Sequence, residues 1–268
     1  MIPALTIGLI LLGAALGAGV AWLMLRGRSV SSGATLLLGA ACALAAGAFA
    51  AFVVVPIVAD SWAIREARAE LLAIPVYQEI GKVEPVVFDR LLGEYAHVVM
   101  DRSRLDTYTR MANTEIAAVA TQHIAHAADA AVLALMQDML DKLQVLLTRS
   151  PTDCYKYLFP NVEGPADFGR WFDRDAQSRT LARMADVIRT SAEQPVPVPP
   201  RERVEPLLTP IINDMYAQFG ENTALLSHAE QHGVDHRTVC AIATTLYEKV
   251  MRLPPADAAA VIRSMTQR

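Results

Sequence analysis

The chain has 268 residues, of which 53% are hydrophobic and 19% are charged, and its mean hydropathy is +0.28. Arg26 and Arg28 are the only charged residues before Asp60, so the other 22 of the 24 basic residues accompany all 28 acidic ones, giving residues 60–268 a formal charge of −6. This acidic balance, with no dense basic run, argues against nucleic acid or anionic lipid headgroups as the partner.

Two long stretches near the N-terminus, residues 2–25 and 33–59, contain no charge apart from the chain terminus. Each is long enough, at about 1.5 Å per residue in a helix, to cross a hydrocarbon core of roughly 30 Å. No Lys or Arg precedes the first stretch, which is also too long for the apolar part of a signal peptide, so we expect it to be retained. The sequence therefore predicts a two-helix transmembrane hairpin over residues 1–59, with the lipid bilayer as one partner.

Small residues recur at four-residue steps in both predicted spans. The first span carries Gly13 and Gly17, and the second carries Gly39, Ala43 and Gly47. Such faces let helices approach closely in lipid, so we predict that they pack the two spans together or build a homo-oligomer. Neither span contains an ionisable residue, which favours an anchor over a channel or transporter.

The short basic connection between the spans predicts the orientation. Arg26 and Arg28 favour a cytoplasmic loop, which would leave both chain ends on the other side of the membrane. Arg65 and Arg68, just after the second span, are an opposing signal. We interpret the pattern as a bacterial-type inner-membrane protein whose C-terminal domain is periplasmic.

Beyond the spans, the pattern predicts an all-α protein with a helical stalk over residues 60–80 and an α-helical soluble domain over residues 81–268. Ala- and Leu-rich segments alternate with Pro and Gly, and strand signals are nearly absent. Ser150 and Asp235 are predicted helix caps. Pro195, Pro197, Pro199 and Pro200 predict an extended connector. The principal predicted helices are 85–102, 105–149, 175–192, 204–231 interrupted at Pro210 and Gly220, and 236–252. For residues 105–149, the alternative is that a new helix starts at Asn113 or Asp129.

Cys154 and Cys240 are the two cysteines of the predicted soluble domain, and their spacing matches no metal motif. If the domain lies outside the cytoplasm, a disulfide between them is expected. If it lies inside, two unrelated buried thiols are the expected arrangement.

Glu115, Gln122, His126 and Asp129 share one stripe of a predicted helix, and His123 flanks them. His123, His126 and Asp129 are therefore the sharpest candidate for a metal site. The competing interpretation is an ordinary polar face on an Ala-rich helix, since neither a His-Glu-x-x-His motif nor ligands from a second helix can be recognised. His228, His232 and His236 are also spaced at four-residue steps, but Gly233 and the Asp235 cap predict a helix break between His232 and His236. No cofactor is expected.

Aromatic residues gather at two places in the soluble domain. Phe168, Trp171 and Phe172 fall in an irregular segment, and Tyr155 and Tyr157 fall in a short predicted turn. They form either a loop pinned onto the core or a contact surface for a partner, since aromatic residues are enriched at binding hot spots.

The sequence carries no G-x-S-x-G elbow and no Gly-rich phosphate loop, so a catalytic activity is not indicated. We hypothesise a membrane-anchored protein-interaction protein of the cell envelope: a sensor, an assembly component or an immunity-type inhibitor. The alternative is a membrane-bound metal-dependent hydrolase that uses His123, His126 and Asp129.

Overall fold

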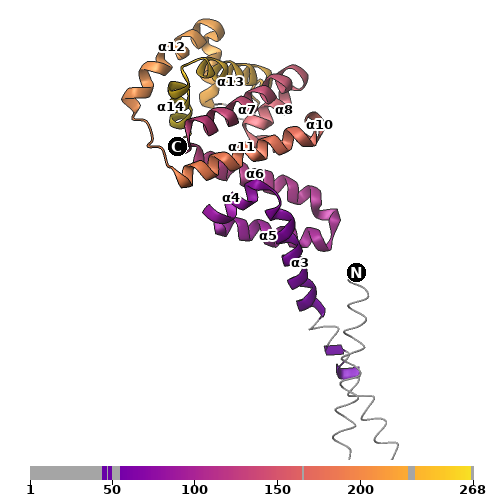
Figure 1. The fold of residues 1–268 in the computed structure, drawn as a ribbon. Helices are drawn as coiled ribbons and strands as arrows, with labels where there is room; N and C mark the ends of the chain where they lie inside the picture. The colour runs from indigo at the N-terminus through magenta and orange to yellow at the C-terminus, as the bar shows by residue number, and fades with distance from the viewer. Residues whose placement is uncertain (1–43, 47, 50–54, 165, 229–232, 267–268) are drawn as a thin grey trace, which may run out of the picture. The chain divides into compact units, whose positions relative to one another are not determined.

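The computed structural model describes residues 44–46, 48–49, 55–164, 166–228 and 233–266, and their regular structure is helical throughout (Figure 1). This confirms the prediction of an all-α protein. The helices are α3 (Val55–Leu72), α4 (Pro75–Val83), α5 (Pro85–Met100), η2 (Arg102–Arg104), α6 (Leu105–Ile124), α7 (Asp129–Arg149), α8 (Pro151–Leu158), α9 (Pro160–Glu163), α10 (Phe168–Trp171), α11 (Arg174–Glu193), α12 (Arg201–Phe219), η3 (Gly220–His228), α13 (His236–Met251) and α14 (Pro255–Met265).

Within these described ranges, no helix combines the length and the apolar character needed to cross a membrane. Most of the predicted hairpin over residues 1–59 lies outside the described residues. The same is true of all the small residues named for helix packing in the spans, which are Gly13, Gly17, Gly39, Ala43 and Gly47. The hairpin stays a prediction.

The chain divides into two compact units. The first consists of residues 1–69 and 95–102, and the second of residues 70–94 and 103–268, so α3 and α5 each contribute to both. Ala63, Ala67 and Val98 are buried residues of the first unit. The candidate functional residues after residue 102 all belong to the second unit.

Local sequence signals account for many helix ends. The backbone N–H of Asp153 donates to Ser150 at the start of α8, and those of Arg237 and Thr238 donate to Asp235 at the start of α13. Both predicted caps are therefore confirmed. Two residues separate α3 from α4, and Pro75 begins α4, as expected for a residue that lacks an N–H and fixes its own φ.

The predicted helix over residues 105–149 is not continuous, and the alternative start at Asp129 is confirmed. The break at residues 125–128 is held by groups distant in sequence. The Arg263 guanidinium donates to the Ala127 carbonyl at 2.7 Å, and the Ala128 N–H donates to the Thr190 hydroxyl at 3.2 Å. These tertiary contacts satisfy the backbone groups that a continuous helix would pair internally, and nothing local in an Ala-rich stretch predicts them.

Helix α12 corrects a second expectation, because it continues through Pro206 and Pro210. It ends at Gly220, whose φ of +57° lies in the left-handed region that glycine adopts without strain. The predicted interruption at Gly220 is confirmed, whereas the one at Pro210 is wrong. The extended proline connector before α12 is also confirmed, since residues 195–200 form no regular structure.

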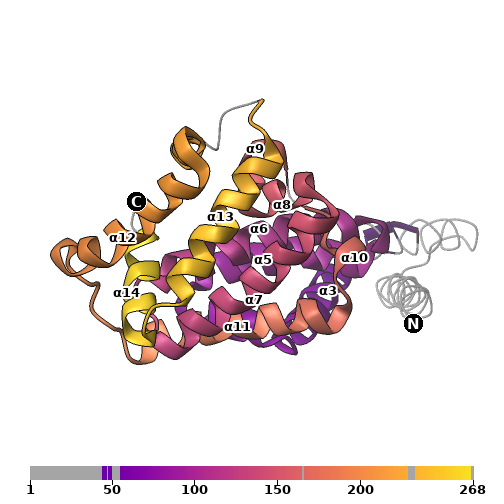
Figure 2. The same ribbon diagram turned by 90° about the horizontal axis from the view of Figure 1, so that it is seen from above.

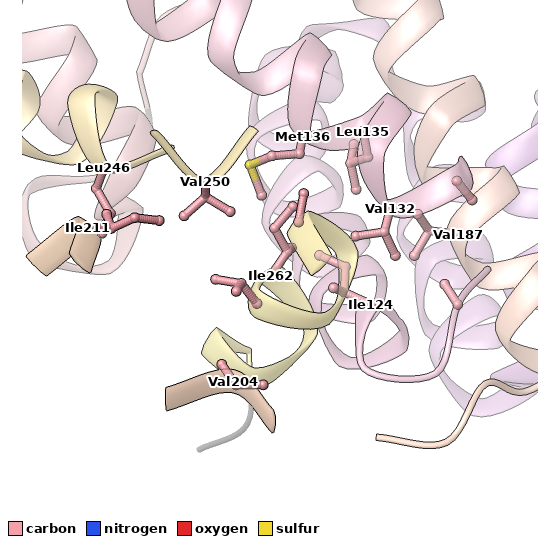
Figure 3. Close-up of a cluster of buried hydrophobic side chains, with 14 of the residues drawn as sticks. Ile124, Val132, Leu135, Met136, Val187, Val204, Ile211, Leu246, Val250 and Ile262 are labelled. Atoms are coloured by element: carbon pink, nitrogen blue, oxygen red, sulfur yellow. The ribbon is translucent and has the colours of Figure 1, made fainter. Parts of the chain in front are cut away.

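The second unit is built around α7 and α11. Helix α11 packs against α4, α6 and α7, while α13 packs against α7 and α8, and α14 against α7 (Figure 2). A large aliphatic cluster fills the space where α7, α12, α13 and α14 meet, with Val132, Val250 and Ile262 almost fully buried (Figure 3). Burying such side chains contributes about 1.5–3 kcal/mol each. This core fixes the helices that carry the candidate site.

Candidate functional site

The packing of α8 on α13 brings Cys154 and Cys240 together as a disulfide. Their Cα atoms lie 6.0 Å apart, at the usual separation for this bond. Both cysteines are fully buried and pack with Leu143 and Leu146 of α7. Of the two alternatives, a disulfide and two unrelated thiols, the structure has the disulfide. The bond links segments 86 residues apart in sequence.

Trp171 and Phe172, which we call the aromatic corner, pack against this disulfide cluster and remain half-buried. The Trp171 indole Nε1–H donates to Oδ2 of Asp153 at 2.8 Å, and the Arg170 guanidinium lies 4.9 Å from the Trp171 ring centroid. The ammonium of Lys142 lies 5.7 Å from the Phe172 ring centroid. The aromatic corner is therefore anchored on α8 and α7. Phe168 begins α10, but its side chain lies outside the described part of the chain.

Tyr155 lies in the core, not at the surface. It is fully buried, and its ring stacks on that of His236 with centroids 4.1 Å apart and an interplanar angle of 10°. His236 Nε2 lies 3.1 Å from Glu163 Oε1, which ties α9 to the start of α13. Phe159 completes the cluster, its ring centroid 5.2 Å from that of Tyr155. The structure assigns Tyr155 a packing position.

Tyr157, on the same short helix, instead lines a cavity of about 150 Å³ formed by α6, α7, α8 and α11. Burial, with smaller contributions from Asp138 and Tyr247, raises the pKa of Tyr157, so the phenol stays protonated at neutral pH. Ile116, Leu181 and Met184 supply apolar wall.

A buried ion pair borders the same cavity. Lys142 lines it and is 5% exposed, and its ammonium pairs with the Asp138 carboxylate and donates to Thr180 Oγ1 at 2.6 Å. The Thr180 hydroxyl also lies 2.8 Å from Asp138 Oδ2. Sequence reasoning did not single out these residues. The available signal was a lysine within the apolar stripe of α7, with an aspartate four residues before it.

The metal candidates do not converge. His123 Nδ1 lies 2.6 Å from Ser191 Oγ, and His126 Nδ1 lies 3.1 Å from the Val196 carbonyl, while Asp129 forms an ion pair with Arg263. The helix break at residues 125–128 separates the stripe that a continuous helix would have formed. Among the described residues, no three His, Cys, Asp or Glu side chains are grouped so that they would hold a metal ion.

Comparison of the chain with protein-family models, curated proteins and solved structures finds no match. The disulfide joins α8 to α13, the aromatic corner lies at the end of α10, and the cavity has residues of α6, α7, α8 and α11 in its lining. A half-buried indole ring held in place by a hydrogen bond, as that of Trp171 is, is suited to binding, because little side-chain entropy is lost when a partner covers it.

Proposed function

We propose that this chain is a membrane-anchored protein of a bacterial-type inner membrane, with two spans and a periplasmic C-terminal domain, that acts by binding another protein. The two charge-free stretches at residues 2–25 and 33–59 support the anchor. The Cys154–Cys240 disulfide supports the periplasmic side, because disulfides persist in oxidising compartments and are rare in the cytosol.

The observation that carries the binding role is the anchored Trp171. Its indole N–H is satisfied by Asp153, and one side of the residue packs on the disulfide cluster, so the exposed part of the ring is held in one position. Tryptophan is enriched at interface hot spots because a single ring buries a large area with few rotatable bonds. The neighbouring Arg170 adds a guanidinium stacked on that ring, a second residue type typical of hot spots.

Site-specific photocrosslinking in intact cells tests this proposal. A photoreactive amino acid in place of Arg170, which is exposed, is expected to yield a crosslinked product of defined mass. The same amino acid in place of Glu221, an exposed residue on η3, serves as the control and is expected to give none. A product of twice the chain's mass identifies a homo-oligomer in place of a different partner.

The dependence on Trp171 provides the specific check. Trp171→Ala is expected to reduce the Arg170 crosslink at least tenfold, because hot-spot truncations cost about 2 kcal/mol or more. Trp171→Phe retains an aromatic ring but loses the hydrogen bond to Asp153, so an intermediate yield is expected. An unchanged yield in Trp171→Ala, with the helical content and the disulfide intact, would refute a binding role for this residue.

The orientation is tested separately with a reporter that is active only in the periplasm. Fused after Arg268, it is expected to be active, whereas a fusion within the loop at residues 26–32 is expected to be inactive. Inactive reporter at Arg268 with normal expression contradicts the periplasmic assignment and leaves the binding test unaffected.

A further inference from the structure

The cavity lined by residues of α6, α7, α8, α9 and α11 has properties that protein binding at the aromatic corner does not use. Its volume of about 150 Å³ equals that of an engineered protein cavity that binds benzene. Apolar wall is supplied by Ile116, Ala117, Leu181 and Met184. A ligand body the size of one aromatic ring therefore fits by volume and by polarity.

The charged side chains that line the cavity are both cationic. Its lining includes Lys142 and Lys156 but no Asp or Glu, although residues 60–268 carry a formal charge of −6. Lys142 is buried and paired with Asp138, which is not part of the lining. Lys156 is half-buried, and no described carboxylate lies within ion-pair distance of it. The cavity thus presents one cation without a counter-ion beside apolar wall, which favours an anion.

Hydrogen-bonding groups reinforce this preference. Asn113 lies in the same lining, and its amide can donate to a carboxylate oxygen. Gln177 also lines the cavity; its amide donates one hydrogen bond to the Phe172 carbonyl at 2.9 Å and carries a second N–H. Hydrogen bonds from such groups to an ionised acceptor are stronger than neutral ones. This composition, mainly apolar with a few placed polar groups, is usual for a pocket that binds a small molecule.

We propose that this cavity binds a small organic monoanion, a carboxylate whose apolar body is about the size of a benzene ring. The body lies against Leu181 and Met184, and the carboxylate faces Lys156. The site is distinct from the aromatic corner in its lining, although Lys142 contacts both through its ion pair and the Phe172 ring.

Calorimetric titration of the full chain in lipid nanodiscs with three probes of matched size tests the proposal. Benzoate is expected to bind at least tenfold more tightly than benzyl alcohol or benzylammonium. Equal affinity for benzyl alcohol would overturn the assignment of an anion. Absence of binding by all three would overturn the site itself.

Two pairs of variants locate the binding. Ala117→Phe fills the cavity and is expected to reduce benzoate affinity more than tenfold, whereas Ala118→Phe, at an exposed position outside the lining, is expected to leave it unchanged. Lys156→Gln is expected to weaken benzoate about threefold to tenfold, as for a half-exposed ion pair, and to leave benzyl alcohol unaffected. Lys82→Gln is its control, since Lys82 is exposed and remote from the lining.

Lys156→Gln keeps the test decisive if Ala117→Phe fails to fold, because Lys156 forms no ion pair with any residue that the structure describes. Unchanged benzoate affinity in Lys156→Gln would overturn the proposed recognition of the carboxylate. Equal losses in Ala117→Phe and Ala118→Phe would show that benzoate binds elsewhere.

Discussion

Two regions of the second unit each join residues that are far apart in the sequence, one through a disulfide and the other through hydrogen bonds. In the disulfide region, formed by α8, the first half of α13 and the aromatic corner, Cys154 and Cys240 join segments 86 residues apart by a covalent bond. In the arginine region, formed by α14 and residues 125–128, Arg263 joins segments 136 residues apart by donating two hydrogen bonds to the Ala127 carbonyl, at 2.7 and 3.2 Å.

The contrast shows which part of the domain depends on its compartment. The arginine region is stabilised by aliphatic burial and by a guanidinium that also pairs with Asp129, so its stability is independent of redox conditions. In the disulfide region, the half-buried Trp171 and Phe172 pack against the cluster that contains the bond. The region proposed to bind a partner is therefore the region whose stability requires an oxidising environment.

Removing the disulfide is expected to have the largest effect on stability. The variant Cys154→Ala/Cys240→Ala should lose about 4 kcal/mol of unfolding free energy, because the bond closes a loop of 86 residues and restricts the unfolded chain. For a domain of this size the melting temperature should fall by about 10 °C, measured by circular dichroism. Reductant should lower the melting temperature of the wild type and leave that of the double variant unchanged. Equal sensitivity of both proteins to reductant would contradict the comparison.

Truncating the aliphatic core of the other region is expected to have the next largest effect. Ile262→Ala should cost about 3 kcal/mol, because the side chain is 1% exposed and its removal leaves a cavity. Chemical denaturation measures the loss. The loss should be the same in the reduced and the oxidised protein, since the two regions are separate and distant sites are usually additive.

Replacing the buried Arg263 tests how much its hydrogen bonds stabilise the arginine region. Arg263→Met should cost about 2 kcal/mol, because the Ala127 carbonyl loses its donor while the apolar replacement keeps most of the volume. The matched control is Arg203→Met, since Arg203 is half-exposed and its nearest carboxylate oxygen, on Asp257, is 3.8 Å away. The control should change the unfolding free energy by no more than about 0.5 kcal/mol. Equal losses in the two variants would show that the buried contacts contribute nothing specific.

The smallest expected effect concerns the cap that begins α13 in the disulfide region. Asp235→Ala should cost about 1 kcal/mol at neutral pH, because the N–H groups of Arg237 and Thr238 lose their acceptor. The hydrogen bond from the Thr238 hydroxyl, then those from the two backbone N–H groups, lower the pKa of Asp235 from 3.8. The contribution is therefore complete above about pH 3.8 and is lost as the pH falls through the lower native pKa.

Denaturation of both proteins across this pH range measures that dependence. The difference between the wild type and Asp235→Ala should shrink as the pH falls below about 3.8. A difference that stays constant through that range would contradict the role of the ionised carboxylate.

The sequence predicted those parts of the fold that depend on local chemistry. Ser150 and Asp235 could be recognised as caps, and Gly220 as a helix end, because each acts on backbone groups within a few residues. The sequence offered the start at Asp129 only as one alternative to a continuous helix, because Arg263, which donates to the Ala127 carbonyl in the break, lies 136 residues away in sequence. Pro210 misled because α12 continues through it; Pro210 itself is exposed, whereas Val204 and Ile211 of the same helix are buried.

The candidate site shows the same division. The aromatic residues and the two cysteines were conspicuous in the sequence, but the separation of buried Tyr155 from cavity-lining Tyr157 required the packing of α8 between α7 and α13. The cavity itself combines residues from five helices, α6, α7, α8, α9 and α11, and no periodicity within one helix predicts it.

The oxidation state of Cys154 and Cys240 in living cells tests the central claim most directly. Cells expressing a Cys42→Ala variant, which leaves only these two cysteines, are denatured in the presence of a thiol-reactive polymer that adds a fixed mass to each free thiol. The account predicts no added mass without reductant and the mass of two polymers after reduction. Labelling of both cysteines without reductant would contradict the assignment of this domain to an oxidising compartment.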